Sequence, residues 1–261
     1  MDQQEQTQFF YEIFDASLPR LGPGDDASTS RALDMLLSAR PEPKGAPEPG
    51  QLRILDIGCG NGAQTIQLAK HTNGSILAVD NHRPFLDELE RRAEAEGVST
   101  KITVCLKDMR ALGMEEGPFD LIWSEGALYI MGFGKGLAVC HGLLRSGGLL
   151  AVSELSWFRP DPPGECQQFF ANEYHAMADI DTNVATIEKC GYETLGRFAL
   201  PESAWWVPYY QPLERRLESL RDKYATDPQR IKLIESVQTE IEVYRKYSAY
   251  YGYVFYLMQR S

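Results

Sequence analysis

Short apolar runs and longer segments with helical periodicity alternate along most of this chain. The apolar runs predict strands near residues 52–57, 75–79, 101–105, 119–124, 147–154, 192–199 and 251–259. The periodic segments predict helices near residues 63–71, 83–96, 134–145 and 182–190. Alternating strands and helices are typical of an α/β protein, in which helices cover both faces of a mostly parallel sheet.

Two more helices are predicted before the first strand. Residues 6–16 carry four apolar side chains along one helical face, and a second helix, capped by Asp26 or Ser28, is expected to end at about Ala39. The proline- and glycine-rich residues 41–50 are typical of a linker. We therefore separate an N-terminal region of helices and linker from the α/β core.

The last two predicted strands are separated by an insertion at residues 208–248. Apolar side chains recur there at helical spacing, at Leu213, Leu217, Leu220, Tyr224, Ile231, Ile234, Val237, Ile241 and Tyr244. Two helices fit this pattern, and they form either a lid over a substrate or an extension of the core. The predicted organisation is residues 1–50 (N-terminal helices and linker), 51–207 (core), 208–248 (insertion) and 249–261 (final core strand).

A glycine-rich motif follows the first predicted strand. The run from Ile54 ends in Asp56, and glycines stand at positions 58, 60 and 62 before the next helix. Glycine lacks Cβ, so the backbone can adopt positive φ and a ligand can approach it closely. The helix start adds unpaired N–H groups and a positive dipole end. This turn suits a nucleotide-like ligand.

An acidic residue ends the second predicted strand. Asp80 closes the run Ser75-Ile-Leu-Ala-Val-Asp80 and can accept hydrogen bonds from both hydroxyls of a ribose. The two motifs together indicate a cofactor that contains adenosine. The stretch Gly58 to Ala63 also fits the G-x-G-x-x-G/A pattern of dinucleotide binders, so an NAD-type cofactor is an alternative at this point.

Five sequence blocks in order resemble the class I S-adenosylmethionine-dependent methyltransferases, especially the small-molecule branch (type 11) that includes quinone-biosynthesis enzymes. The blocks are Leu55-Asp-Ile-Gly-Cys-Gly-Asn-Gly62, Ala78-Val-Asp80, Lys107-Asp-Met109, Phe119-Asp-Leu-Ile-Trp-Ser-Glu-Gly-Ala-Leu128 and Leu143-Leu-Arg-Ser-Gly-Gly-Leu-Leu-Ala-Val152. The resemblance implies a Rossmann-like, seven-stranded, mostly parallel sheet with an antiparallel last strand. It also places the helical insertion between the sixth and seventh strands.

The same resemblance implies S-adenosylmethionine as the cofactor and assigns residues to it. The cofactor-binding residues are then Asp56, Gly58, Gly60, Asp80, Asn81, Asp108, Met109 and Ser124. Asp56 would lie near the methionine amine, and Asp80 would take the ribose hydroxyls. Asp108 would accept from the adenine amino group and Met109 would pack on the ring. The alternatives are a solvated loop carboxylate at Asp108 and ordinary core packing at Met109.

Acidic and aromatic side chains near the ends of later strands are candidates for catalysis and substrate binding. Glu125, just past the fourth strand, is the first candidate for a base or a substrate anchor, and Tyr129 lies one helical turn on. Substrate contacts are predicted at the ends of the fifth and sixth strands, from Glu154, Trp157, Trp205 and Trp206. Carboxylates beside aromatic rings suit a cationic amine, and the rings also suit a flat phenol or quinol. Lid packing is the alternative role for these rings.

Composition and charge exclude several kinds of binding partner. A net charge of −11 disfavours binding to nucleic acid, because phosphate binding needs clustered Lys and Arg. The five scattered cysteines lack metal-ligand spacing and predict reduced thiols. The acidic, polar N-terminus does not resemble a secretion signal, and no apolar run of about 20 residues predicts a membrane span. We therefore expect a cytoplasmic protein without a metal.

The sequence predicts a methyltransferase that acts on the nitrogen, oxygen or carbon of a small molecule. A dinucleotide-dependent oxidoreductase is the first alternative, although Tyr129 is followed four residues later by Phe133 and so lacks the Tyr-x-x-x-Lys signature. A cofactor-binding protein without catalytic activity is the second. A protein substrate is a third, which an enclosed aromatic pocket would argue against. The oligomeric state is not given by the sequence, and a homodimer remains open.

Overall fold

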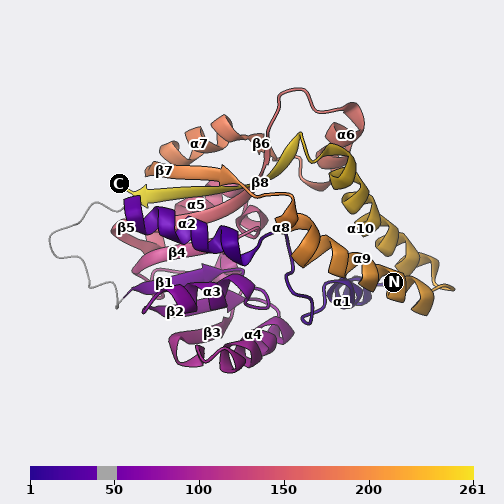
Figure 1. The fold of residues 1–261 in the computed structure, drawn as a ribbon, viewed down its shortest axis with the longest axis horizontal. Helices are drawn as coiled ribbons and strands as arrows, with labels where there is room; N and C mark the ends of the chain where they lie inside the picture. The colour runs from indigo at the N-terminus through magenta and orange to yellow at the C-terminus, as the bar shows by residue number, and fades with distance from the viewer. Residues whose placement is uncertain (40–51) are drawn as a thin grey trace.

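An eight-stranded sheet forms the centre of the molecule in the computed structural model, which describes residues 1–39 and 52–261 (Figure 1). The strands are β1 (Arg53–Ile57), β2 (Ser75–Asp80), β3 (Ile102–Leu106), β4 (Phe119–Glu125), β5 (Leu144–Trp157), β6 (Ala178–Asp179), β7 (Tyr192–Ala199) and β8 (Tyr251–Arg260). Their order is β3-β2-β1-β4-β5-β8-β7, and the two-residue β6 pairs with β5. The predicted seven strands are confirmed, and β6 is an addition.

Strand directions also match the prediction. The pairs β1–β2, β1–β4, β2–β3 and β4–β5 are parallel, whereas β8 is antiparallel to both β5 and β7. The strands at the centre of the sheet, such as β1 and β4, are buried on both faces, which is why their sequences read as continuous apolar runs. The order in which strands are added reverses at β1, because β2 and β3 lie on one side of it and β4 lies on the other. The carboxyl end of β1 is therefore at a switch point, where α/β folds bind ligands.

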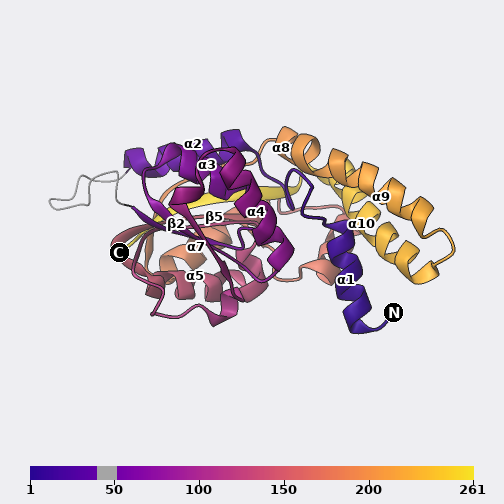
Figure 2. The same ribbon diagram turned by 90° about the horizontal axis from the view of Figure 1, so that it is seen from below.

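Helices cover both faces of the sheet (Figure 2). They are α1 (Gln3–Ile13), α2 (Asp26–Ala39), α3 (Ala63–His71), α4 (Arg83–Ala95), α5 (Phe133–Leu143), α6 (Gly164–Glu173), α7 (Ile180–Lys189), α8 (Ser203–Trp205), α9 (Gln211–Lys223) and α10 (Pro228–Tyr247). Short helical turns are η1 (Ser99–Lys101), η2 (Met109–Ala111), η3 (Leu128–Met131) and η4 (Trp206–Tyr210), the last a π-helix. Buried side chains of α2, α3 and α4 pack on one face, and those of α5 and α7 pack on the other.

A third apolar cluster lies beside the sheet rather than on it. It joins side chains of α1, α6 and the helices between β7 and β8, and it is rich in aromatic residues. In Figures 1 and 2, α1, α9 and α10 project together from one side of the sheet. The predicted helical insertion between the last two large strands is thereby confirmed. The two predicted N-terminal helices have separate places, because α2 packs on the core sheet and α1 packs with the insertion.

The insertion begins earlier in the chain than predicted. The sequence placed Trp205 and Trp206 at the end of a strand, but β7 ends at Ala199 and both tryptophans lie in the helical turns α8 and η4. Proline lacks the N–H that a sheet ladder needs, so Pro201 ends the strand pattern. The linker predicted at residues 41–50 lies outside the described residues.

None of the helices in the described part of the chain has both the length and the apolar character needed to cross a membrane.

Candidate functional site

The glycine-rich turn after β1 has the backbone geometry that only glycine adopts readily. Gly58, Gly60 and Gly62 have φ angles of +69°, +54° and +86°. A Cβ on Gly58 would lie 2.5 Å from the Cβ of Ala127, and one on Gly62 would lie 2.2 Å from Cδ1 of Leu89. The turn therefore brings β1, the loop after β4 and helix α4 closer together than a side chain would allow.

Asp80, at the end of β2, faces this turn. Its Oδ2 accepts a hydrogen bond from the Gly60 N–H at 3.0 Å, and its Oδ1 accepts from the His82 N–H at 3.0 Å. A carboxylate offers about four acceptor positions, so each oxygen keeps a position for a further donor. Burial raises the pKa of this carboxyl above its usual range. Asp80 can thus hold the turn and accept two hydroxyls at once.

A cavity lies where the carboxyl ends of β1, β2, β3 and β4 meet. Most of the residues predicted to bind a cofactor line it, namely Gly58, Gly60, Asp80, Asn81, Asp108 and Met109. Glu125, predicted as a catalytic residue, lines the same cavity. The strand ends thus bring together side chains from four separate stretches of sequence. We call this the cofactor cavity.

Two predicted cofactor residues lie outside the wall of the cofactor cavity. Asp56 is fully buried and accepts hydrogen bonds from Thr65 at 2.6 Å and from Gln64 at 3.4 Å. Burial raises the pKa of Asp56 to about 7. Ser124 is also fully buried and donates to the carbonyl of Ile57 at 3.0 Å. In this structure Asp56 orients Gln64, which does line the cavity.

The segment between α1 and α2, residues 14–25, crosses over the cofactor cavity, and we call it the N-terminal strap. Its Arg20 donates to Glu125 Oε2 at 2.9 Å, and both side chains are buried. Glu125 Oε1 accepts from Thr29 Oγ1 at 2.7 Å and from the Trp123 indole N–H at 2.9 Å. The carboxylate of Glu125 thus has three donors and holds the strap to the end of β4.

Two more side chains of the core hold the strap through its backbone. Asn61, in the glycine-rich turn, donates to the carbonyls of Ala16 at 3.1 Å and Leu18 at 2.6 Å. Arg92, on α4, donates to the same two carbonyls, at 3.2 Å and 2.8 Å, and to Pro19 at 3.1 Å. The strap is therefore a fixed part of the site.

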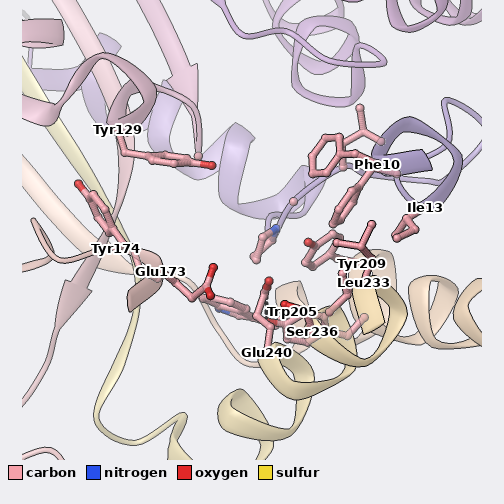
Figure 3. Close-up of a pocket in the computed structure, with 18 of the residues that line it drawn as sticks. Phe10, Ile13, Tyr129, Glu173, Tyr174, Trp205, Tyr209, Leu233, Ser236 and Glu240 are labelled. Atoms are coloured by element: carbon pink, nitrogen blue, oxygen red, sulfur yellow. Dashed lines mark hydrogen bonds between the residues drawn. The ribbon is translucent and has the colours of Figure 1, made fainter. Parts of the chain in front are cut away.

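A larger cavity adjoins the first. Its volume is about 740 Å³, and aromatic side chains dominate its wall, namely Phe10, Tyr11, Phe14, Phe85, Tyr129, Phe169, Phe170, Tyr174, Trp205, Tyr209, Tyr210, Tyr251 and Tyr253 (Figure 3). The two cavities share the wall residues Leu21, Gly22, Pro23, Phe85 and Gly126. We call the larger one the aromatic cavity. The aromatic cavity and the cofactor cavity meet beneath the strap.

Only some of the residues predicted to act in catalysis or substrate binding line the aromatic cavity. Tyr129, which is 41% exposed, and Trp205 both line the aromatic cavity (Figure 3). Trp157 packs edge-on against Phe170 at 5.4 Å and lies beside a different surface hollow. Trp206 is absent from the cavity wall and has the Arg245 guanidinium 4.9 Å from its ring centre.

Glu154 lies behind the wall of the aromatic cavity. It is 2% exposed, and its Oε1 accepts a hydrogen bond from the hydroxyl of Tyr174 at 2.6 Å. Its Oε2 is buried and has no hydrogen-bond partner among the described residues. Burial raises the pKa of Glu154 to about 7. Glu154 can therefore influence the cavity only through Tyr174 in this arrangement.

We expect the free energy of unfolding of the Glu154→Gln variant to rise above that of the unsubstituted protein as pH increases. The folded-state pKa of Glu154 lies above its unfolded value of about 4.5, so its contribution to stability is lost as pH rises toward 7. Glutamine stays neutral, so its relative gain should reach up to about 3 kcal/mol above pH 7. Urea unfolding between pH 4 and 8 measures this. The exposed Glu188→Gln on α7 is the control, and a gain independent of pH would contradict the prediction.

Three important side chains were not singled out from the sequence. Arg20 was missed because its partner Glu125 lies 105 positions away in the chain. Glu173 and Glu240 line the aromatic cavity, and the sequence analysis named neither of them. A signal for Glu240 did exist, because it stands three residues after Val237 and four before Tyr244, within the apolar stripe of its helix.

The sequence comparisons match methyltransferases. A family model described as a methyltransferase domain matches residues 54–148. The sterol 24-C-methyltransferase of Aspergillus fumigatus is 22% identical over 172 residues, which cover 62% of this chain and 45% of that protein. The 27-O-demethylrifamycin SV methyltransferase of Amycolatopsis mediterranei is 25% identical over 231 residues, which cover 84% of this chain and 78% of the relative. The chain thus spans about half the length of the sterol enzymes that it matches.

A solved structure matches along almost the whole chain. The S-adenosylmethionine-dependent methyltransferase from Thiobacillus denitrificans, in complex with S-adenosyl-L-homocysteine, superposes with a TM-score of 0.81 at 18% identity. The match covers 97% of this chain and 98% of that one. At this identity the likeness shows that the fold is shared, including the regions outside residues 54–148.

Proposed function

We propose that this chain, a class I S-adenosylmethionine-dependent methyltransferase, transfers the methyl group of its cofactor to a small organic molecule held in the aromatic cavity. The observation that carries the proposal is the junction of the two cavities beneath the strap. Five residues, three of them in the strap, belong to both walls. A cofactor in one cavity and an acceptor in the other would meet there.

The residues of the cofactor cavity fit S-adenosylmethionine. The free acceptor positions of Asp80 suit the two ribose hydroxyls, and the positive-φ glycines leave backbone that a ligand can approach. Asp108 is partly exposed at the end of β3 and suits the adenine amino group, with Met109 beside it. Asp56 and Ser124 would act from beneath the cavity, and Asn81 would contact the adenine side.

The task of the protein in this reaction is orientation and the exclusion of water. The bound cofactor supplies a methyl group that is already activated by a positively charged sulfur. Holding the acceptor in line with this methyl group can contribute roughly 7–11 kcal/mol to lowering the barrier. Three strap residues line the junction, and with both ligands bound the strap would help to exclude water from it. We propose that Tyr129, which lines the aromatic cavity, positions the acceptor, and that Glu125 acts through the strap that it holds.

The acceptor is proposed to be an aromatic compound or an amine, methylated on nitrogen, oxygen or carbon. The aromatic wall of the cavity supports stacking or cation–π contacts with such a molecule. The two curated relatives are named for action on a sterol and on a rifamycin, which are also small molecules. The net charge of −11 argues against nucleic acid. Five unpaired cysteines support a reducing, cytoplasmic location.

We expect the purified chain to bind S-adenosylmethionine and S-adenosylhomocysteine in the micromolar range and not to bind NADH. Calorimetric titration measures this, and a labelled methyl donor then identifies acceptors among amines, phenols and quinols. Tyr129→Phe should lower turnover more than cofactor affinity. Binding of NADH alone would support a dinucleotide-dependent oxidoreductase instead. Cofactor binding without transfer to any acceptor in the panel would support a non-catalytic binding protein.

A further inference from the structure

We propose that the molecule bound in the aromatic cavity is an organic cation, and that Glu240 holds its protonated nitrogen with help from Glu173. This inference rests on the proposed function and narrows its substrate class. The methylated atom need not be the charged nitrogen. The charge is the feature by which the cavity recognises its ligand.

Glu240 lies in the wall of the cavity and not on the outer surface of its helix. It comes from α10, and its Oε1 accepts a hydrogen bond from the hydroxyl of Tyr210 at 3.1 Å. No other described residue donates a hydrogen bond to Glu240, so its second oxygen is left for a ligand. Figure 3 shows the carboxylate of Glu240 directed into the cavity, near Trp205.

A second carboxylate faces the same space. Glu173, at the end of α6, points toward Glu240 in Figure 3 and is exposed at the edge of the cavity. Burial, followed by the nearby Glu173, raises the pKa of Glu240 to about 7. Among the described residues that line the cavity, none is a lysine, arginine or histidine. The two carboxylates thus lack a positive partner in the wall, and a cationic ligand would supply one.

The remaining wall is suited to a cation with an apolar body. Aromatic rings attract cations through their negative faces, and they also bury apolar surface. The hydroxyl of Tyr251 is an independent sign of a missing ligand. Tyr251 lines the cavity and is 2% exposed, yet its hydroxyl has no hydrogen-bond partner among the described residues. Buried hydroxyls in proteins are nearly always paired, so we expect the wall around Tyr251 to adjust and give this hydroxyl a partner when a ligand binds.

A neutral phenol or quinol satisfies this cavity less well. It can stack on the rings, but it would bury Glu240 further without giving it a positive partner. Above its pKa of about 7 the carboxyl would then have to remain an unpaired charge or take up a proton, and either costs free energy. An ammonium group can instead donate to Glu240 in a charge-assisted hydrogen bond, which is about twice as strong as a neutral one. The cavity therefore discriminates by charge between molecules of the same shape.

The test compares tryptamine with tryptophol, which have the same ring system and differ in an ammonium against a hydroxyl group. Both are titrated calorimetrically into the chain saturated with S-adenosylhomocysteine. We expect tryptamine to bind at least about 10-fold more tightly, the scale of a hydrogen bond to a charged group. Glu240→Gln should bring the two affinities to within about 2-fold and leave S-adenosylhomocysteine binding unchanged. Glu235→Gln, an exposed position on the same helix, is the matched control and should keep the preference.

The outcomes separate this inference from the proposed function. Equal binding of the two probes, a preference for tryptophol, or binding of neither probe would overturn the inference while cofactor binding still stood. A preference for tryptamine that survives Glu240→Gln would also overturn it, because another group would then hold the cation. If the unsubstituted chain does not bind S-adenosylhomocysteine at all, that result would count against the proposed function instead.

Discussion

Asp80→Ala should weaken the binding of S-adenosylmethionine by about 10- to 150-fold, or about 1.5–3 kcal/mol, the range for hydrogen bonds to a charged group. The substitution removes the two oxygens proposed to accept the ribose hydroxyls. It also removes the acceptors of the Gly60 and His82 N–H groups, so the glycine-rich turn loses support. Calorimetric titration of the variant with S-adenosylmethionine gives the result directly.

Asp87→Ala is the matched control for this loss. Asp87 is an exposed carboxylate on α4 whose ion pair is with Arg83 at 2.7 Å, so its removal should leave cofactor affinity unchanged. Asp80→Asn keeps one acceptor oxygen and should give an intermediate loss. If Asp80→Ala binds the cofactor as tightly as the unsubstituted protein, the ribose lies elsewhere.

Arg20→Met should lower the free energy of unfolding by about 3 kcal/mol. Arg20 is 6% exposed, and its removal leaves the buried Glu125 carboxylate without a positive partner. Thr29 and Trp123 still donate to that carboxylate, which places the expected cost at the lower end for a broken buried ion pair. Urea unfolding monitored by fluorescence measures the change.

The double variant Arg20→Met/Glu125→Gln tests whether the unpaired charge of Glu125 causes the loss of stability. Neutralising Glu125 should recover most of the stability that Arg20→Met loses, because the buried charge is then gone. Arg83→Met, which breaks two exposed ion pairs on α4, with Asp87 and Glu90, should cost less than about 1 kcal/mol. A loss for Arg20→Met no larger than that of Arg83→Met would show that the ion pair does not stabilise the strap.

The features that the sequence predicted well depend on residues close together in the chain. The glycines at 58, 60 and 62 and the acidic end of β2 each report a local requirement, a tight turn or a strand end. The regular alternation of apolar runs and helices likewise predicted the succession of strands and helices along the chain. These signals are short-range, so a single sequence is enough to read them.

The features that were missed depend on pairing across the fold. Arg20 and Glu125 lie 105 positions apart and are brought together only by the tertiary fold, and nothing in either local sequence indicates the other. Trp157 and Trp206 were predicted to bind substrate because they are aromatic and near strand ends. The structure places one against Phe170 and the other beneath Arg245, because the direction of a side chain is decided by packing around it.

The two cavities draw on different parts of the chain. The cofactor cavity takes most of its wall from residues 58–130, whereas the aromatic cavity takes most of its wall from α1, α6, the insertion and β8. Mutations in the second set can alter which molecule is accepted without disturbing the first set. With the function proposed above, selection could therefore diversify the acceptor quickly while the methyl donor stays fixed.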